Sequence, residues 1–155
     1  MDNVARPTQE YLDTLLLYYE EEIIGEACFY ALVDFYGEPY KTTLIARAET
    51  VAAEAVEPLL QKYQLKPRDR DELERIGLES VDWYQGFNWA GFMQYIVERF
   101  PGYIEDFRDL EAMGPPEDQP YLQKLTQHEF AVIDFAEREI AGDPGSTAPM
   151  LKYLA

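Results

Sequence analysis

Apolar residues recur at helical spacing through most of the chain, and we therefore expect an all-helical protein. Alternating runs of β-branched residues closed by tight-turn signals, which are typical of strands, are missing from the sequence. The pattern predicts principal helices over residues 10–36, 40–63, 71–100 and 120–141, with a short extra helix over 103–113 before the last long helix. Short connections between long helices favour an antiparallel four-helix bundle.

Residues typical of helix ends support these boundaries. Thr8 is a suitable N-cap for the first helix, and Gly37 ends that helix. Gly86 weakens the third helical region, where a bend is expected. The sequence Gly-Pro-Pro-Glu-Asp at 114–118 predicts a loop, and the tail at 150–155 can pack as a last turn.

Several acidic residues fall on the apolar stripes that face the predicted core. Side-chain direction advances by about 100° per residue along a helix, so spacing shows which residues share a face. The inward acids are Glu22 and Glu26 in the first helix, Glu49 in the second, Glu129 in the last, and Asp82 in the third. His128 lies about 100° from Glu129, at the edge of the same face.

Buried carboxylates need partners, because an unpaired buried charge costs several kcal/mol and favours protonation. Arg47, Lys124 and Arg138 project away from the apolar stripes and cannot neutralise these acids. The remaining partners are protons, the hydroxyl groups of Tyr19 and Tyr30, water, or a bound cation. A single inward glutamate often lies at a helix end or binds a tyrosine, but agreement across three helices favours a shared site for a hard or borderline metal ion.

The helices, the inward acids and their spacing resemble the ferritin-like superfamily of di-iron carboxylate four-helix bundles, over residues 10–141. In that family, one glutamate from each of two helices and a Glu-x-x-His pair from each of the other two hold the metal. The resemblance implies iron or another divalent metal as the cofactor. The candidate metal ligands are Glu22, Glu26, Glu49, Glu129, His128 and Asp82.

The sequence departs from the family pattern at both histidines. Ala52 and Val132 occupy the positions three residues after Glu49 and Glu129, where the family has histidine. His128 is the only histidine in the chain, and it can substitute only if its helix is rotated or distorted. The resemblance thus implies a ferritin-like fold around an altered carboxylate-rich site, of oxidoreductase type if it is active. Whether the protein is an enzyme stays open.

Composition and charge narrow the classes of partner. A chain of 155 residues fits one domain, residues 1–155. The net charge of −17 at pH 7 argues against nucleic acid and anionic membrane surfaces as partners, because both require a basic face. We expect a cytoplasmic protein, since Cys28 is the only cysteine and the chain has neither a signal-peptide pattern nor a membrane-spanning apolar stretch.

An alternative function follows from the aromatic residues. The chain has 12 Tyr, 8 Phe and 2 Trp, more than a small core requires, and many of them lie between Trp83 and Tyr95 in the third helix. The protein would then be a metal-free binding or interaction module whose aromatic third helix forms a pocket or a homodimer surface. The sequence does not identify a small-molecule ligand.

Overall fold

The computed structural model describes residues 7–155, and all regular secondary structure in this range is helical, as predicted. The long helices are α1 (Gln9–Ala31), α2 (Pro39–Lys62) and α7 (Gln119–Ile140). The shorter elements are α3 (Arg70–Glu79), α4 (Val81–Tyr84), α5 (Trp89–Arg99), α6 (Pro101–Met113), the 3-10 helix η1 (Pro116–Asp118) and α8 (Ala148–Leu154). The predicted domain at 1–155 includes residues 1–6, which lie outside the described part.

The predicted start of the first helix is confirmed, but its end is earlier than expected. The Thr8 hydroxyl accepts a hydrogen bond from the Tyr11 backbone N–H at 3.1 Å, which makes Thr8 the N-cap of α1. At the other end, the Leu32 N–H bonds to the carbonyl of Phe29, and the chain turns toward Gly37, whose φ is +74°. The last five residues of the predicted helix therefore form turns.

The predicted third helix is divided into α3, α4 and α5. The chain leaves helical geometry after Tyr84, and Asn88 then caps α5 by accepting a hydrogen bond from the Gly91 N–H at 2.8 Å. Gly77 lets α3 lie directly against α1, because a Cβ at this position would come within 2.3 Å of the Ile24 carbonyl oxygen. The predicted short helix is confirmed as α6. Pro101 occupies its first turn, where the missing N–H costs nothing.

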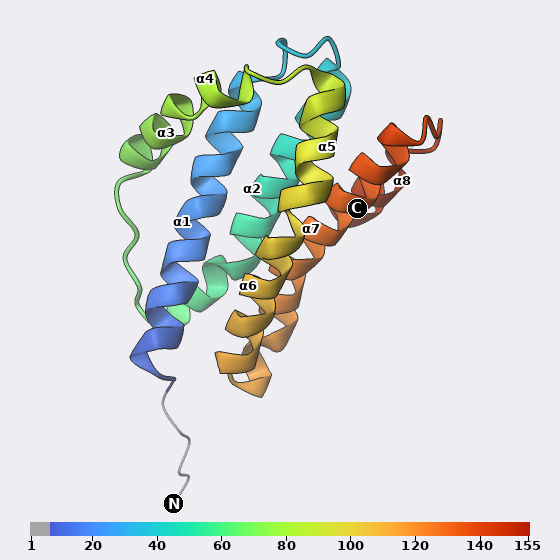
Figure 1. Ribbon diagram of the computed structural model, residues 1–155. Coiled ribbons are helices and arrows are strands. Elements are labelled where there is room, and N and C mark those ends of the chain that lie inside the picture. Colours follow the sequence, from blue (N-terminus) through green and yellow to red (C-terminus); the bar gives the residue numbers. More distant parts are fainter. Residues whose placement is uncertain (1–6) are drawn as a thin grey trace, which may run out of the picture.

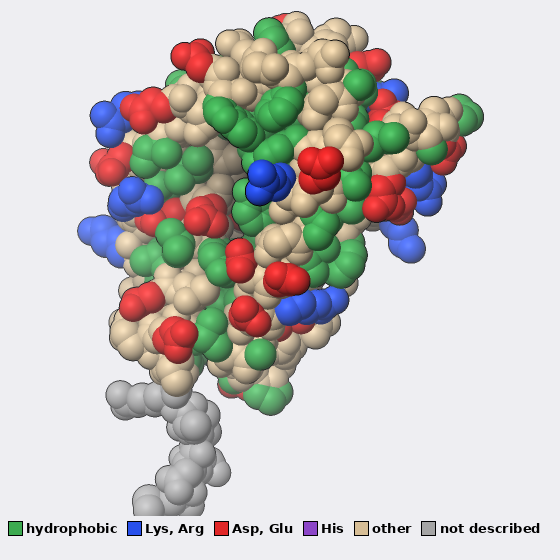
Figure 2. All heavy atoms as spheres, viewed as in Figure 1, with side chains coloured by type: hydrophobic (Ala, Val, Ile, Leu, Met, Phe, Trp, Pro, Cys, Tyr) green, Lys and Arg blue, Asp and Glu red, His purple; other side chains and the backbone are tan. Residues whose placement is uncertain are grey.

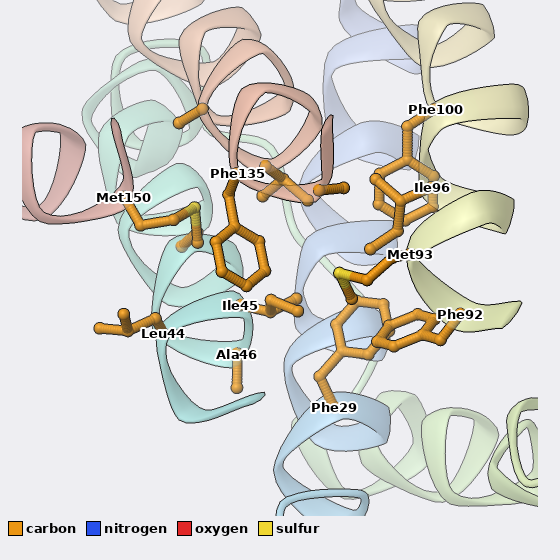
Figure 3. Close-up of a cluster of buried hydrophobic side chains, with 14 of the residues drawn as sticks. Phe29, Leu44, Ile45, Ala46, Phe92, Met93, Ile96, Phe100, Phe135 and Met150 are labelled. Atoms are coloured by element: carbon orange, nitrogen blue, oxygen red, sulfur yellow. The ribbon is translucent and has the colours of Figure 1, made fainter. Parts of the chain in front are cut away.

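The helices pack side by side around two buried hydrophobic clusters. Figure 1 shows α1, α2 and α7 alongside the α5–α6 pair, with α3 on the outside of α1 and α8 packed on α7. We call the clusters upper and lower, after their place in Figure 1. Figure 3 shows part of the upper cluster, in which Phe29, Ile45, Met93 and Phe135 come from four different helices.

The lower cluster shows the direction of each helix. It contains Leu15 from α1, Leu60 from α2, Leu110 from α6 and Leu122 from α7. The chain therefore passes from the lower cluster to the upper one along α1 and α7, and from the upper to the lower along α2 and along α5–α6. The chain between α2 and α5, a loop followed by α3 and α4, crosses from the lower end of α2 back to the upper end of the molecule (Figure 1). None of the described helices has the length and apolar character needed to cross a membrane.

The predicted loop at 114–118 is held against the lower ends of α1 and α2 by Asp118. Its carboxylate is fully buried and accepts hydrogen bonds from the hydroxyls of Tyr11 (2.8 Å) and Tyr63 (2.5 Å) and from Lys62 Nζ (2.6 Å). Because this carboxylate has three donors, it is a satisfied structural group.

Candidate metal centre

Three glutamates and the histidine form a polar layer between the two hydrophobic clusters. Glu22 lies on α1, Glu49 on α2, and His128 and Glu129 on α7. Each lies where its helix passes from one cluster to the other. All four are buried, with exposed fractions of 4% for Glu22, 7% for Glu49, 0% for His128 and 4% for Glu129. Three helices thus interrupt the core at one level with ionisable groups.

The imidazole of His128 is the centre of this layer. Its Nε2 atom lies 2.7 Å from Glu129 Oε1, 3.1 Å from Glu22 Oε2 and 3.6 Å from Glu49 Oε2. On the other side of the ring, Nδ1 contacts the backbone carbonyl of Leu125. A carbonyl can only accept, so Nδ1 is the donor, and in the neutral ring Nε2 is left with a free lone pair directed at the carboxylates. Metal-binding histidines are usually oriented in this way, by a hydrogen bond from the ring nitrogen that does not bind the metal.

Several atoms in the polar layer lack hydrogen bonds despite being buried. Within residues 7–155, Glu22 Oε2, Glu129 Oε2 and His128 Nε2 have no hydrogen-bond partner; the fourth such atom is Glu26 Oε2, whose carboxylate pairs with Arg70 through its other oxygen. The contacts of the imidazole with the carboxylates are therefore short in distance without being aligned hydrogen bonds. Buried polar atoms are nearly always satisfied in folded proteins, so these atoms point to a group that binds among them.

The donor atoms are close enough to share one ion. One donor atom from each of Glu22, Glu49 and His128 lies within 4.8 Å of the other two. Ligands of a zinc-like ion lie about 2.0–2.2 Å from it, so two donors on one ion are about 3–4.4 Å apart. Small side-chain movements would bring the three groups to this spacing.

The electrostatics of the layer favour a cation. Burial raises the pKa of Glu49 well above its usual range, and the neighbouring Glu22 raises it further. Burial also raises the pKa of Glu129. Burial alone would lower the pKa of His128, but the carboxylates of Glu22 and Glu129 raise it well above its ordinary value. Among the described residues, His128 is the only basic group within 4.0 Å of the three carboxylates, so ionised glutamates leave two negative charges unbalanced.

A glycine makes room for the carboxylate of Glu49. A Cβ at Gly25, which lies on α1 nearly one turn after Glu22, would come within 3.1 Å of Glu49 Cδ and 3.2 Å of its Oε2. Any larger side chain at Gly25 would push the carboxylate away from its present place. The close approach of α1 to the Glu49 side chain therefore depends on this glycine.

The polar layer borders a cavity of about 230 Å³. Glu22, Glu49 and Glu129 form its acidic side, and the other walls come from α1, from Ser80 and α4, and from the α5–α6 segment. Figure 2 shows acidic side chains gathered along the boundary between α1 and α6 on the face turned to the viewer. The carboxylates are thus accessible to a small molecule through this cavity.

Two of the six predicted ligands lie away from the polar layer. Glu26 Oε1 accepts a hydrogen bond from Arg70 Nη2 at 3.1 Å, because α3 packs against this side of α1. Asp82 is exposed on α4, since the break in the third predicted helix ends the periodicity that placed it inward. The other four, Glu22, Glu49, His128 and Glu129, come together.

The hydroxyl groups expected as partners for the buried acids lie elsewhere. Tyr19 donates to Glu57 at 3.4 Å, and Tyr30 is 43% exposed. The sequence also placed His128 only at the edge of the core. The rings of Phe107 and Tyr153 cover it, with centroids 5.8 and 6.3 Å from the imidazole. The apolar face of the predicted short helix indicated that Phe107 would be buried. The pattern did not indicate that Phe107 would pack against His128.

The polar layer thus combines buried, unpartnered donor atoms with an excess of negative charge and an adjoining cavity. Comparisons of the chain with models of protein families, with curated proteins and with solved structures find no match.

Proposed function

We propose that this protein is a ferritin-like helical-bundle protein that binds a divalent metal ion, such as iron, at Glu22, Glu49, His128 and Glu129. The observation that carries the proposal is the convergence of Glu22, Glu49 and His128 from three helices, with buried atoms of Glu22, His128 and Glu129 that lack hydrogen-bond partners. With His128 neutral, as ligation requires, the three carboxylates supply more than enough negative charge to balance a divalent ion. When bound, the ion supplies Lewis acidity, and iron in addition supplies one-electron redox chemistry.

The helix directions support a ferritin-like arrangement. In the proposed four-helix bundle, α1 and α7 run opposite to α2 and to the α5–α6 pair. The segment α3–α4 would be the single long crossover that distinguishes ferritin-like bundles from simple up-and-down bundles. The short extra helix of the sequence pattern, α6, would then be the second half of the third bundle helix.

The ligand set favours one ion over two. The positions where the family has histidine hold Ala52 and Val132, which are buried and apolar, with exposed fractions of 0% and 2%. One histidine and three glutamates would suffice to hold a single divalent ion. We therefore propose a mononuclear site in place of the di-iron centre of the family.

Elemental analysis of the purified protein tests the proposal. Protein expressed in medium replete with iron or manganese should carry close to one ion per chain, and the Glu22→Gln variant should lose it. Glu26→Gln is the matched control, because it changes a glutamate one turn along the same helix that pairs with Arg70 instead. If wild-type protein binds no metal and a chelator leaves its thermal stability unchanged, the proposal is wrong.

A second candidate function is a metal-free interaction module, and one observation favours it. Trp83 is 55% exposed and stands edge-on to the rings of Tyr84, Phe87 and Tyr95, with centroid distances of 5.0–5.2 Å. Such an aromatic surface suits a homodimer contact. Sedimentation of wild-type protein and of Trp83→Ser tests it, since a dimer through this surface should dissociate in the variant.

A further inference from the structure

The cavity beside the polar layer has walls of two kinds. One side is formed by the carboxylates, and the opposite walls are mainly apolar or aromatic. Cys28 and Phe29 come from α1, Tyr84 from α4, and Tyr103 and Phe107 from α6. A ligand with an apolar body and one polar end would match both kinds of wall.

The size of the cavity suits a single-ring molecule. Its volume is about 230 Å³. An apolar cavity of about 150 Å³ is known to hold benzene, so this one has room for a six-membered ring with a short polar substituent. It is too small for a nucleotide or a peptide segment.

The charges around the cavity exclude an anion. Among the described residues that line it, no lysine or arginine occurs, and Glu21 adds a fourth carboxylate near the mouth. Burial raises the pKa of Tyr103 to about 12, so its hydroxyl is neutral at physiological pH. An anionic ligand would meet acidic and neutral groups only.

We propose that this cavity binds an organic molecule the size of one ring that carries no negative charge, with its apolar part against Phe29 and Phe107 and its polar group toward Glu22, Glu49 and Glu129. The inference names the ligand class of the proposed metal centre and rests on that proposed function for the polar end of the ligand. The apolar part of the ligand is held by the cavity walls alone. Binding of a neutral probe is therefore expected in both metal-free and metal-loaded protein.

Benzyl alcohol, benzoate and benzylamine are suitable probes, because they share a ring and differ in charge at neutral pH. Each is titrated by calorimetry into metal-free and Zn²⁺-loaded protein, and amide chemical shifts locate the site. Benzyl alcohol should bind both forms and shift the amides of Gly25, Cys28 and Ser80. In metal-free protein, benzoate should bind about tenfold more weakly than benzyl alcohol or not at all, and benzylamine, whose positive charge suits the acidic side of the cavity, should bind at least as tightly as benzyl alcohol.

Variants at the mouth of the cavity test whether benzyl alcohol binds there. Ser80→Leu and Tyr103→Trp add bulk at two partly exposed wall positions, and each should weaken benzyl alcohol binding about tenfold. Leu78→Phe adds bulk two residues away, at a position that is 55% exposed and outside the cavity lining, and should bind as wild type does. Circular dichroism shows whether each variant folds. If Ser80→Leu or Tyr103→Trp does not fold, binding to the other of these two variants tests the location of the site.

The outcomes separate this inference from the proposed metal site. If no metal binds but benzyl alcohol binds metal-free protein at these amides, the metal site is wrong and the ligand pocket stands. If metal binds but benzyl alcohol binds neither form, or binds both blocking variants as tightly as wild type, the pocket is wrong. Tighter binding of benzoate than of benzyl alcohol to metal-free protein would overturn the exclusion of anionic ligands.

Discussion

Replacing Glu49 by glutamine should reverse the order of stability between metal-free and metal-loaded protein. The Glu49 carboxylate is 7% exposed, its pKa is raised by burial and by Glu22, and no lysine or arginine among the described residues pairs with it. In metal-free protein, the ionised form of this carboxylate is therefore a source of instability. Glutamine keeps the shape and removes the charge. With metal present, the same substitution removes a ligand.

The magnitudes follow from burial and mass action. Because one histidine is shared by three buried carboxylates, removing one of the negative charges relieves its desolvation and its repulsion with Glu22, so metal-free Glu49→Gln should be at least as stable as wild type. At a free metal concentration 100 times the dissociation constant, wild type should gain about 2.7 kcal/mol. For a chain of this length, that gain raises the melting temperature by about 5–11 °C.

Thermal unfolding in EDTA and in excess Mn²⁺ measures both effects. Wild type should melt below Glu49→Gln in EDTA and above it in Mn²⁺. Glu26→Gln should follow wild type in both conditions, because Glu26 pairs with Arg70 away from the polar layer. The reasoning is refuted if wild type melts above Glu49→Gln in EDTA and Mn²⁺ shifts neither protein.

Three further predictions concern other parts of the structure. Gly77→Ala should lower the free energy of unfolding by about 1–3 kcal/mol in urea titrations, because its Cβ would lie 2.3 Å from the Ile24 carbonyl oxygen. Gly102→Ala, whose Cβ would meet open space, should cost less. Equal losses for the two variants would contradict the close packing of α3 on α1. Burial raises the pKa of Asp118, but three hydrogen-bond donors lower it overall, so its contribution to stability is present above the ordinary aspartate pKa and lost as the pH falls through its lowered value. Asp118→Asn should therefore flatten the fall in stability below about pH 4, and an unchanged acid profile would count against this role. Burial raises the pKa of the Cys28 thiol to about 12, so iodoacetamide should alkylate it at pH 8 only in unfolded protein, which mass spectrometry can detect.

Helical periodicity placed three of the candidate acids correctly. Glu22, Glu49 and Glu129 are buried as predicted, because side-chain direction within an unbroken helix depends only on local geometry. The same reasoning was wrong for Asp82, since the helix that was assumed to carry it is broken after Tyr84. Periodicity is therefore informative only where the helix continues through the whole pattern. Metal binding by the buried residues stays a prediction.

Two features could not follow from spacing, because they depend on residues far apart in the chain. Glu26 is drawn out of the polar layer by Arg70, which reaches it only because α3 packs on α1. His128 is fully buried because α6 and α8 cover its side of α7, through Phe107 and Tyr153. A histidine at the edge of a helical stripe can face solvent or core, and only its neighbours in space decide which.

The sequence by itself thus determined the helices, most of their ends and the inward direction of three glutamates, because caps, breakers and periodicity act within one segment. Tertiary packing decided that these glutamates meet at one level, that the histidine joins them and that a cavity opens beside them. The physical reason is that helix formation and side-chain direction are set by near neighbours. The convergence of charges depends on how α1, α2, α6 and α7 are aligned against one another.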